Sequence, residues 1–148
     1  MPEDETIKRA REDAREGKAP STQAGEFVRE EIEHVREGKH GARSAKQAIA
    51  IGLSKARRAG VKLPPPKASK TSAETQRKAK LDSAKAGREK KPSAKRSRAT
   101  LAALKRESRV SASKAALAGQ ARSAAKKRTK QDRSKAAQKA AKTRESHK

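Results

Sequence analysis

Residues 21–66 read STQAGEFVREEIEHVREGKHGARSAKQAIAIGLSKARRAGVKLPPP, and this stretch decides the fold. In its first part, apolar residues recur every three or four positions between Ala24 and Val35, which is the spacing of one helical face. Charged residues occupy the other side, and Gly38 follows as a helix stop. The pattern predicts an amphipathic helix over residues 21–37.

A second helix is predicted to begin at Ser44, which has the spacing of a capping box with Gln47, and to end at Gly60. Three prolines at 64–66 prevent continuation of the helix and form a stiff spacer. We therefore expect residues 21–63 to form a short antiparallel helical hairpin. Small residues on the second helix would let the first approach closely. This predicted contact face consists of Ala45, Ala48, Ile49, Gly52, Leu53 and Ala56.

Outside the hairpin the sequence has little apolar material. Leu, Ile, Val and Phe number 15 of 148 residues, and nine of these 15 fall in residues 21–63. A highly charged chain with less than ~20% of these residues is expected to be largely disordered. Residues 1–20 are predicted to form an acidic helix, which ends at Gly17, followed by a linker. Ile7 is the only large apolar side chain of this helix. Residues 67–148, built mainly from Ala, Lys, Arg, Ser and Thr, are predicted to be a low-complexity basic tail that is largely disordered when free. The expected fold class is therefore mostly α and disordered.

The charge is divided unevenly along the chain. Residues 1–37 carry 7 Lys/Arg against 11 Asp/Glu, whereas residues 38–148 carry 34 against 6. A polycation of this density repels itself until a polyanion neutralises it, and nucleic acid is the obvious counterpart. The chain has one aromatic residue, Phe27, so it lacks the stacking platforms with which proteins read unstacked bases. These features predict sequence-independent binding to phosphates, with duplex DNA as the favoured partner and RNA as the alternative.

The candidate nucleic-acid-binding residues come from two places. One is the end of the hairpin, where the sequence places basic residues without nearby acids, and the other is the set of dense basic runs in the tail. The hairpin loop is longer than the turn of a helix-turn-helix reader, so base-specific readout is not expected. The candidates are Lys39, Arg43, Lys46, Lys55, Arg57, Arg58, Lys62, Lys90, Lys91, Lys95, Arg96, Lys126, Lys127 and Arg128.

No pattern typical of an enzyme occurs. The sequence has no phosphate-binding loop, dinucleotide fingerprint or nucleophile elbow, and the acids of residues 30–33 are expected on a solvated helix face. It has no Cys, and His34, His40 and His147 are interpreted as isolated, exposed side chains and not as metal ligands. We therefore expect no catalytic residue, no metal and no cofactor.

The sequence also bears on location. No apolar run approaches the length of a membrane span, and the acidic start is unlike a secretory signal. The expected location is the cytoplasm, in association with the nucleoid, and no membrane partner is expected.

The stretch quoted first, with KRSRATLAALKRE at 95–107, GQARSAAKKR at 119–128 and DRSKAAQKAAKTRE at 132–145, resembles a family of small basic bacterial proteins of unknown function. Some of these are loosely labelled DNA-binding. AIAIGLSKARRAG at 48–60 is its most distinctive part. The tail also resembles those of linker histones and bacterial histone-like proteins. These likenesses imply DNA binding but assign no role to any residue.

Two other functions are compatible with the sequence. An RNA- or ribosome-associated basic protein would share the same charge pattern. A helical protein-interaction module would instead use the apolar face of the first helix to bind a second copy or another protein, with the tail as an appendage. The residues predicted for this self-association are Phe27, Val28, Ile32 and Val35.

Overall fold

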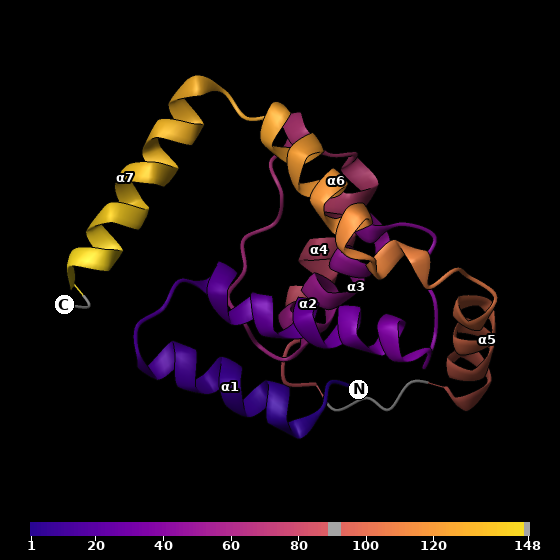
Figure 1. Cartoon of the computed structure of the whole chain (residues 1–148). Coiled ribbons are helices and arrows are strands. Elements are labelled where there is room, and N and C mark those ends of the chain that lie inside the picture. Colours follow the sequence, from indigo (N-terminus) through magenta and orange to yellow (C-terminus); the bar gives the residue numbers. More distant parts are fainter. Residues whose placement is uncertain (89–92, 147–148) are drawn as a thin grey trace. The chain divides into compact units, whose positions relative to one another are not determined.

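A computed structural model of the chain describes residues 1–88 and 93–146, and within these ranges it contains helices and no strand (Figure 1). None of the described helices combines the length and the apolar character needed to cross a membrane. The elements divide into two compact units, Met1–Ser113 and Lys114–Lys148. The α-helices are α1 (Asp4–Arg15), α2 (Pro20–Glu37), α3 (Ala45–Arg58), α4 (Ala73–Ala84), α5 (Ala94–Lys105), α6 (Lys114–Lys126) and α7 (Lys130–Ser146), and two 3-10 turns are η1 (Ala68–Lys70) and η2 (Val110–Ala112).

The helical hairpin predicted for residues 21–63 is present as α2 and α3. Gly38 ends α2 in the left-handed conformation, with φ of 78°. Oγ of Ser44 accepts a hydrogen bond from the backbone N–H of Gln47 at 3.2 Å, and Oε1 of Gln47 accepts one from the N–H of Arg43 at 2.7 Å. In a capping box the side chain of Gln47 would accept from the N–H of Ser44, whereas here it accepts from the N–H of Arg43, one residue earlier. Ser44 is nevertheless the N-cap of α3, as predicted.

The two helices approach closely at Gly52, as the small residues of this face predicted. A Cβ atom at this position would lie 2.6 Å from Cα of Val28, so only glycine permits the crossing. Next to it, the first apolar cluster joins Ala24 and Phe27 of α2 to Ala56 of α3. The partly buried side chains packed against this cluster are Ile7, Leu53, Val61 and Leu63.

Helix α1 covers the first cluster, although Ile7 is its only large apolar side chain. Thr6 and Ala10 are buried, and Ile7 packs against the cluster. Nε of Arg9 also donates to Oε2 of Glu26 in α2 at 2.7 Å. Small side chains and an ion pair thus attach α1 to the hairpin, although it has few large apolar residues.

A second apolar cluster lies at the loop end of the hairpin. It joins Val35, Ala42 and Ala48 to Ala112, and Ile32 packs against it. Ala112 belongs to the region that the sequence predicted as a disordered tail, yet it is fully buried here. The hairpin therefore completes its core with a residue that comes much later in the chain.

Backbone hydrogen bonds hold this later segment, residues 104–112, against the hairpin loop. The N–H of Gly41 donates to the carbonyl oxygen of Leu104 at 2.8 Å, and the N–H of Ala42 donates to that of Ser108 at 3.1 Å. A Cβ atom on Gly41 would overlap the carbonyl oxygen of Glu107, so glycine is needed for this approach. We call residues 104–112 the docking segment.

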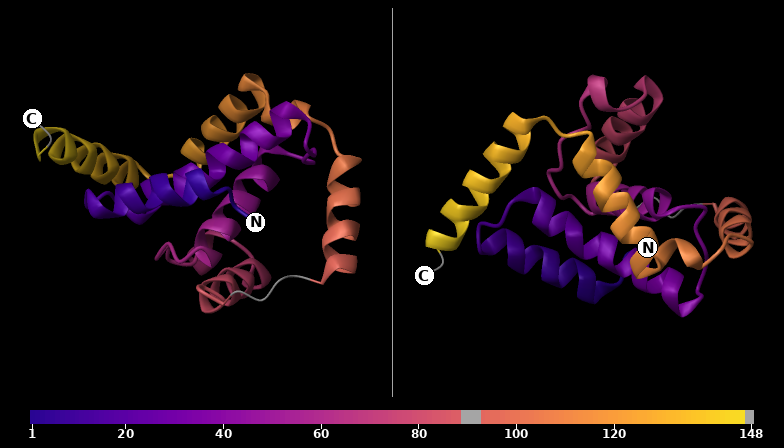
Figure 2. Two further views of the ribbon diagram at one scale, coloured as in Figure 1. Left: turned by 90° about the horizontal axis from the view of Figure 1, so that it is seen from below. Right: turned by 45° about the horizontal axis from the view of Figure 1, so that its top comes forward.

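Most of the other described tail residues are also helical, which corrects the prediction that residues 67–148 are largely disordered. As the structure describes them, α5, α6 and α7 contain no buried residue, and Figure 2 shows α5 and α7 as regular helices along their length. Ala, Lys and Arg are strong helix formers. Capping adds to this propensity, because Oγ of Ser72 accepts from the N–H of Thr75 at the start of α4, and Oγ1 of Thr129 accepts from the N–H of Asp132 at the start of α7. Local preferences therefore account for these helices.

The apolar face predicted to mediate self-association is used inside the chain. Phe27 is 1% exposed and Val35 is 0% exposed. Val28 faces Gly52 at the helix crossing, and Ile32 packs against the second cluster. Burial therefore removes Phe27 and Val35 from contact with a second copy, while Val28 and Ile32 stay partly exposed.

Candidate nucleic-acid interface

Lys55, one of the predicted nucleic-acid contacts, lies inside the hairpin. Its Nζ is 3.1 Å from Oε1 of Glu30 and 2.7 Å from Oε2 of Glu31, and these carboxylates are only 2% and 1% exposed. Glu30 and Glu31 are therefore buried partners of Lys55. The sequence-based expectation that they lie on a solvated helix face is wrong. Burial lowers the pKa of Lys55, but the two carboxylates outweigh it and hold that pKa above its usual value. Lys55 is a structural cation that joins α3 to α2.

Arg57 and Arg58, at the end of α3, also act within the fold. Arg57 is 8% exposed, its Nη2 donates to the carbonyl oxygen of Pro64 at 3.4 Å, and burial lowers its pKa. Nε of Arg58 donates to Oδ1 of Asp82 at 2.8 Å, and Oγ of Ser54 donates to Oδ2 of the same carboxylate at 2.6 Å. These contacts attach α4 and the proline spacer to α3. Arg57 is therefore buried away from a large anion, whereas Arg58 is paired with Asp82 but its side chain is 59% exposed.

Lys39, in the hairpin loop, is paired with two carboxylates. Its Nζ lies 3.2 Å from Oε1 of Glu3 and 3.1 Å from Oε2 of Glu37. The prediction that this end of the hairpin is cationic and free of acids is therefore wrong, because the fold brings Glu3, just before α1, and acids of α2 and α4 to its bases.

Three of the predicted hairpin residues are exposed and make no ion pair shorter than 4.0 Å with another described residue. Arg43 is 81% exposed and has Glu107 at the edge of ion-pair range, 4.0 Å away. Lys46 and Lys62 are exposed as well. Arg43, Lys46 and Lys62 can meet a large anion without breaking a close ion pair, whereas Lys39 and Arg58 would first have to exchange a carboxylate partner for it.

The predicted residues of the tail lie at exposed helix ends. Lys95 and Arg96 are in the first turn of α5, where cations oppose the positive end of the helix dipole. Lys126 ends α6, and Lys127 and Arg128 follow it, all exposed. Both groups carry positive charge that the neighbouring sequence does not balance. Lys90 and Lys91 lie outside the described residues.

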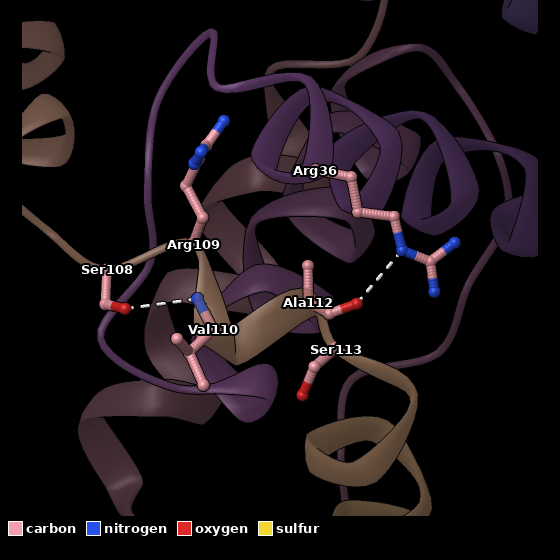
Figure 3. Close-up of a pocket in the computed structure, with 6 residues that line it drawn as sticks. All are labelled: Arg36, Ser108, Arg109, Val110, Ala112 and Ser113. Atoms are coloured by element: carbon pink, nitrogen blue, oxygen red, sulfur yellow. Dashed lines mark hydrogen bonds between the residues drawn. The ribbon is translucent and has the colours of Figure 1, made fainter.

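The docking segment borders an open hollow of about 510 Å³ that the sequence did not predict (Figure 3). Nε of Arg36 donates to the carbonyl oxygen of Ala112 at 3.0 Å, while the guanidinium group of Arg109 lies on a different side of the segment and points away from that of Arg36 (Figure 3). The two arginines therefore do not form a clamp for one phosphate. The hollow is lined by Arg36, Ser108, Arg109, Val110, Ala112 and Ser113.

Among the described residues, one group brings together three side chains of metal-ligand type. Glu31, His34 and His40 each place one potential ligand atom within 4.8 Å of the others. The centroids of the two imidazole rings are 6.1 Å apart, and their side chains are 13% and 10% exposed. The interpretation of these histidines as isolated and exposed is therefore wrong, whereas His147 lies outside the described residues. The i, i+3 spacing of Glu31 and His34 was the available sequence signal.

Comparison with known proteins adds one match. Residues 21–68 match the model of a family described as a family of unknown function (DUF6496). The match spans α2, α3 and the proline spacer, so the predicted resemblance to an uncharacterised family holds for the hairpin and does not extend over the tail. No curated protein and no solved structure matches the chain. The family description assigns no activity to any residue.

Proposed function

We propose that this protein binds nucleic acid without sequence preference, with duplex DNA as the favoured partner, by neutralising phosphates along its basic helices. Association with the nucleoid follows from this proposal. One observation carries it: the basic residues of the hairpin are largely paired within the fold, whereas those of α5, α6 and α7 lie on helices that have no buried residue.

The charge balance of the second unit supports this proposal. Residues 114–148 carry 12 Lys/Arg against 2 Asp/Glu. In α7, lysines at 135, 139 and 142 follow one another at helical spacing, and like charges three or four positions apart destabilise a helix by a few tenths of a kcal/mol each. A polyanion along these helices removes that repulsion, so binding and helix stability reinforce each other.

The absence of sequence readout follows from the side chains that the helices offer. Phe27, the only aromatic residue in the sequence, is buried in the first cluster and cannot stack on a base. Lys and Arg on all sides of a helix contact phosphates along a duplex but fix no single register. Counterion release is then the main source of affinity.

The test is the salt dependence of binding to two unrelated DNA duplexes of equal length. Each neutralised phosphate contributes about −0.9 to the slope of log affinity against log salt, so eight contacts give a slope of about −7. The two duplexes should bind with similar affinity at every salt concentration. A shallow slope, or a preference of more than about 100-fold for one sequence, would contradict phosphate-only binding.

A matched pair of triple variants locates the contacts. Replacing Lys126, Lys127 and Arg128 by Gln should reduce the slope by about 2.7, if all three contact phosphates. The control replaces Arg9, Lys18 and Arg29 by Gln, which removes the same formal charge from residues that are paired with carboxylates. An equal effect of both variants would mean that net charge alone, and not the exposed tail, determines binding.

Competition with RNA decides between the two nucleic-acid partners. Duplex DNA, duplex RNA and a single strand of equal charge compete for the protein at one salt concentration. Preference for duplex DNA supports the proposal, and a clear preference for either RNA or single strands assigns the protein to the alternative class.

A further inference from the structure

We propose that Glu31, His34 and His40 form a binding site for one divalent transition-metal ion of the zinc class. Glu31 and His34 lie three residues apart on α2, and His40 lies in the loop just after Gly38. The turn at Gly38 brings the ring of His40 back to that of His34, edge to face, at an interplanar angle of 83°. One potential ligand atom from each residue lies within 4.8 Å of the other two.

The carboxylate of Glu31 is the first reason to place a cation there. It is 1% exposed, and neither of its oxygens accepts a hydrogen bond. Oε2 is paired with Nζ of Lys55 at 2.7 Å, whereas Oε1 has Nε2 of His40 at 3.2 Å without the angles of a hydrogen bond. A buried anionic acceptor without an aligned donor is costly. The Oε1 side of Glu31 is the side that faces the imidazole.

Charge balance at the same place gives a second reason. Glu30 and Glu31 are both buried and share one cation, Lys55. One negative charge is therefore left over in a region from which water is excluded, and buried charges need a partner. A metal ion beside Glu31 supplies this partner.

The hydrogen bonds of the two imidazoles favour the metal ion. Nδ1 of His40 lies 3.0 Å from the carbonyl oxygen of Gly41, which can only accept, so Nδ1 carries the proton and Nε2 is free to act as a ligand. Nε2 of His34 lies 2.9 Å from Oε1 of Glu3, a carboxylate contact that fixes the orientation of this ring. A carbonyl or carboxylate behind each ring is the usual arrangement around metal-binding histidines.

The donor set also selects the class of metal. Two imidazole nitrogens and one carboxylate oxygen suit Zn²⁺, and leave a fourth position for water. Bonds of about 2.0–2.1 Å in a tetrahedral site place the ligand atoms about 3.3 Å apart, so the three side chains must close slightly. Because His40 follows the end of α2, the bound ion would tie the hairpin loop to this helix.

The test uses the full chain, stripped of metal with a chelator and titrated with Co²⁺, whose visible absorption is intense only when few ligands surround it. We expect one Co²⁺ per chain with intense absorption, displaced by one equivalent of Zn²⁺. His34→Gln and His40→Gln should each weaken Zn²⁺ binding by at least about 100-fold, more than the loss of an outer-shell partner. His147→Gln, at the third histidine of the sequence, is the matched control and should bind as the unchanged chain does.

A thermal melt with and without Zn²⁺ gives an independent readout. Zn²⁺ should raise the midpoint of the unchanged chain and of His147→Gln, but not that of His34→Gln. If His40→Gln does not fold, comparison of His34→Gln with the unchanged chain still tests whether Zn²⁺ binds at this site. Weak Co²⁺ absorption in the unchanged chain, or equal loss in His147→Gln, would overturn the proposal.

Discussion

The docking segment can be released by one methyl group. In Gly41→Ala the new Cβ would overlap the carbonyl oxygen of Glu107, which is backbone and cannot move away as a flexible side chain could. Gly41 has no positive φ, so alanine is compatible with the local backbone and the effect is purely steric. We expect residues 104–112 to leave the hairpin loop while α2 and α3 stay folded.

The free-energy cost follows from the contacts that are lost. They are three hydrogen bonds, from Gly41 to Leu104, from Ala42 to Ser108 and from Arg36 to Ala112, together with the burial of the Ala112 methyl group. At about 0.5–1.5 kcal/mol for each hydrogen bond and about 0.8 kcal/mol for the methyl group, the loss is about 2–5 kcal/mol.

Amide hydrogen exchange measures this loss directly. The N–H groups of Gly41 and Ala42 donate to the docking segment, so their exchange should accelerate by about 30-fold or more in the variant. The N–H of Gln47, which is capped by Ser44, should keep its protection and serves as the internal reference. Gly25→Ala is the matched control, because a Cβ there meets no heavy atom within 4 Å. Unchanged protection of Gly41 and Ala42 in Gly41→Ala would refute the docking of residues 104–112.

Three further predictions concern the hairpin. Gly52→Ala places a Cβ against the backbone of Val28 and should lower the free energy of unfolding by about 1–3 kcal/mol in urea titrations. A higher free energy of unfolding in this variant would show that α2 and α3 can move apart without cost. Lys55→Met leaves Glu30 and Glu31 buried without their cation and should cost about 3–5 kcal/mol by the same assay; a loss below about 1 kcal/mol would mean that water reaches the pair. The pKa of Glu30 is held below its usual 4.5, since its hydrogen bonds and Lys55 outweigh burial, so its stabilising effect is present above pH 4.5 and is lost as the pH falls through the lowered value. Acid titrations should show this contribution in the unchanged chain and not in Glu30→Gln, and identical acid unfolding of the two would contradict it.

The hairpin could be predicted from the sequence because its determinants are local. The spacing from Ala24 to Val35, the stop at Gly38 and the cap at Ser44 each act within a few residues. The close crossing at Gly52 was predictable for the same reason, since small residues repeat along one face of α3.

Two kinds of feature could not be predicted from the sequence. The first is contact between residues far apart in the chain, and the second is the burial of charged side chains that a sequence pattern places on the surface. Thr6 and Ala10 bury α1 without being large, and Ala112 is one alanine among many in the tail. Lys55 was placed on a basic surface, although it follows Gly52 by three positions and so shares the face that meets α2. In the tail, the low apolar content predicts disorder, whereas the helix propensity of Ala, Lys and Arg predicts the helices that the structure contains.

The docking segment also determines which pieces of this protein can be studied separately. The family match ends at residue 68, which makes a natural place to cut an expression fragment. Such a fragment would keep both helices of the hairpin but lose Ala112, so Val35, Ala42 and Ala48 would meet water at the loop end. An uncovered apolar end invites association between copies. A dimer of the short fragment would then be a consequence of removing Ala112. A fragment that ends after residue 113, where the first compact unit ends, keeps this residue and avoids the artefact.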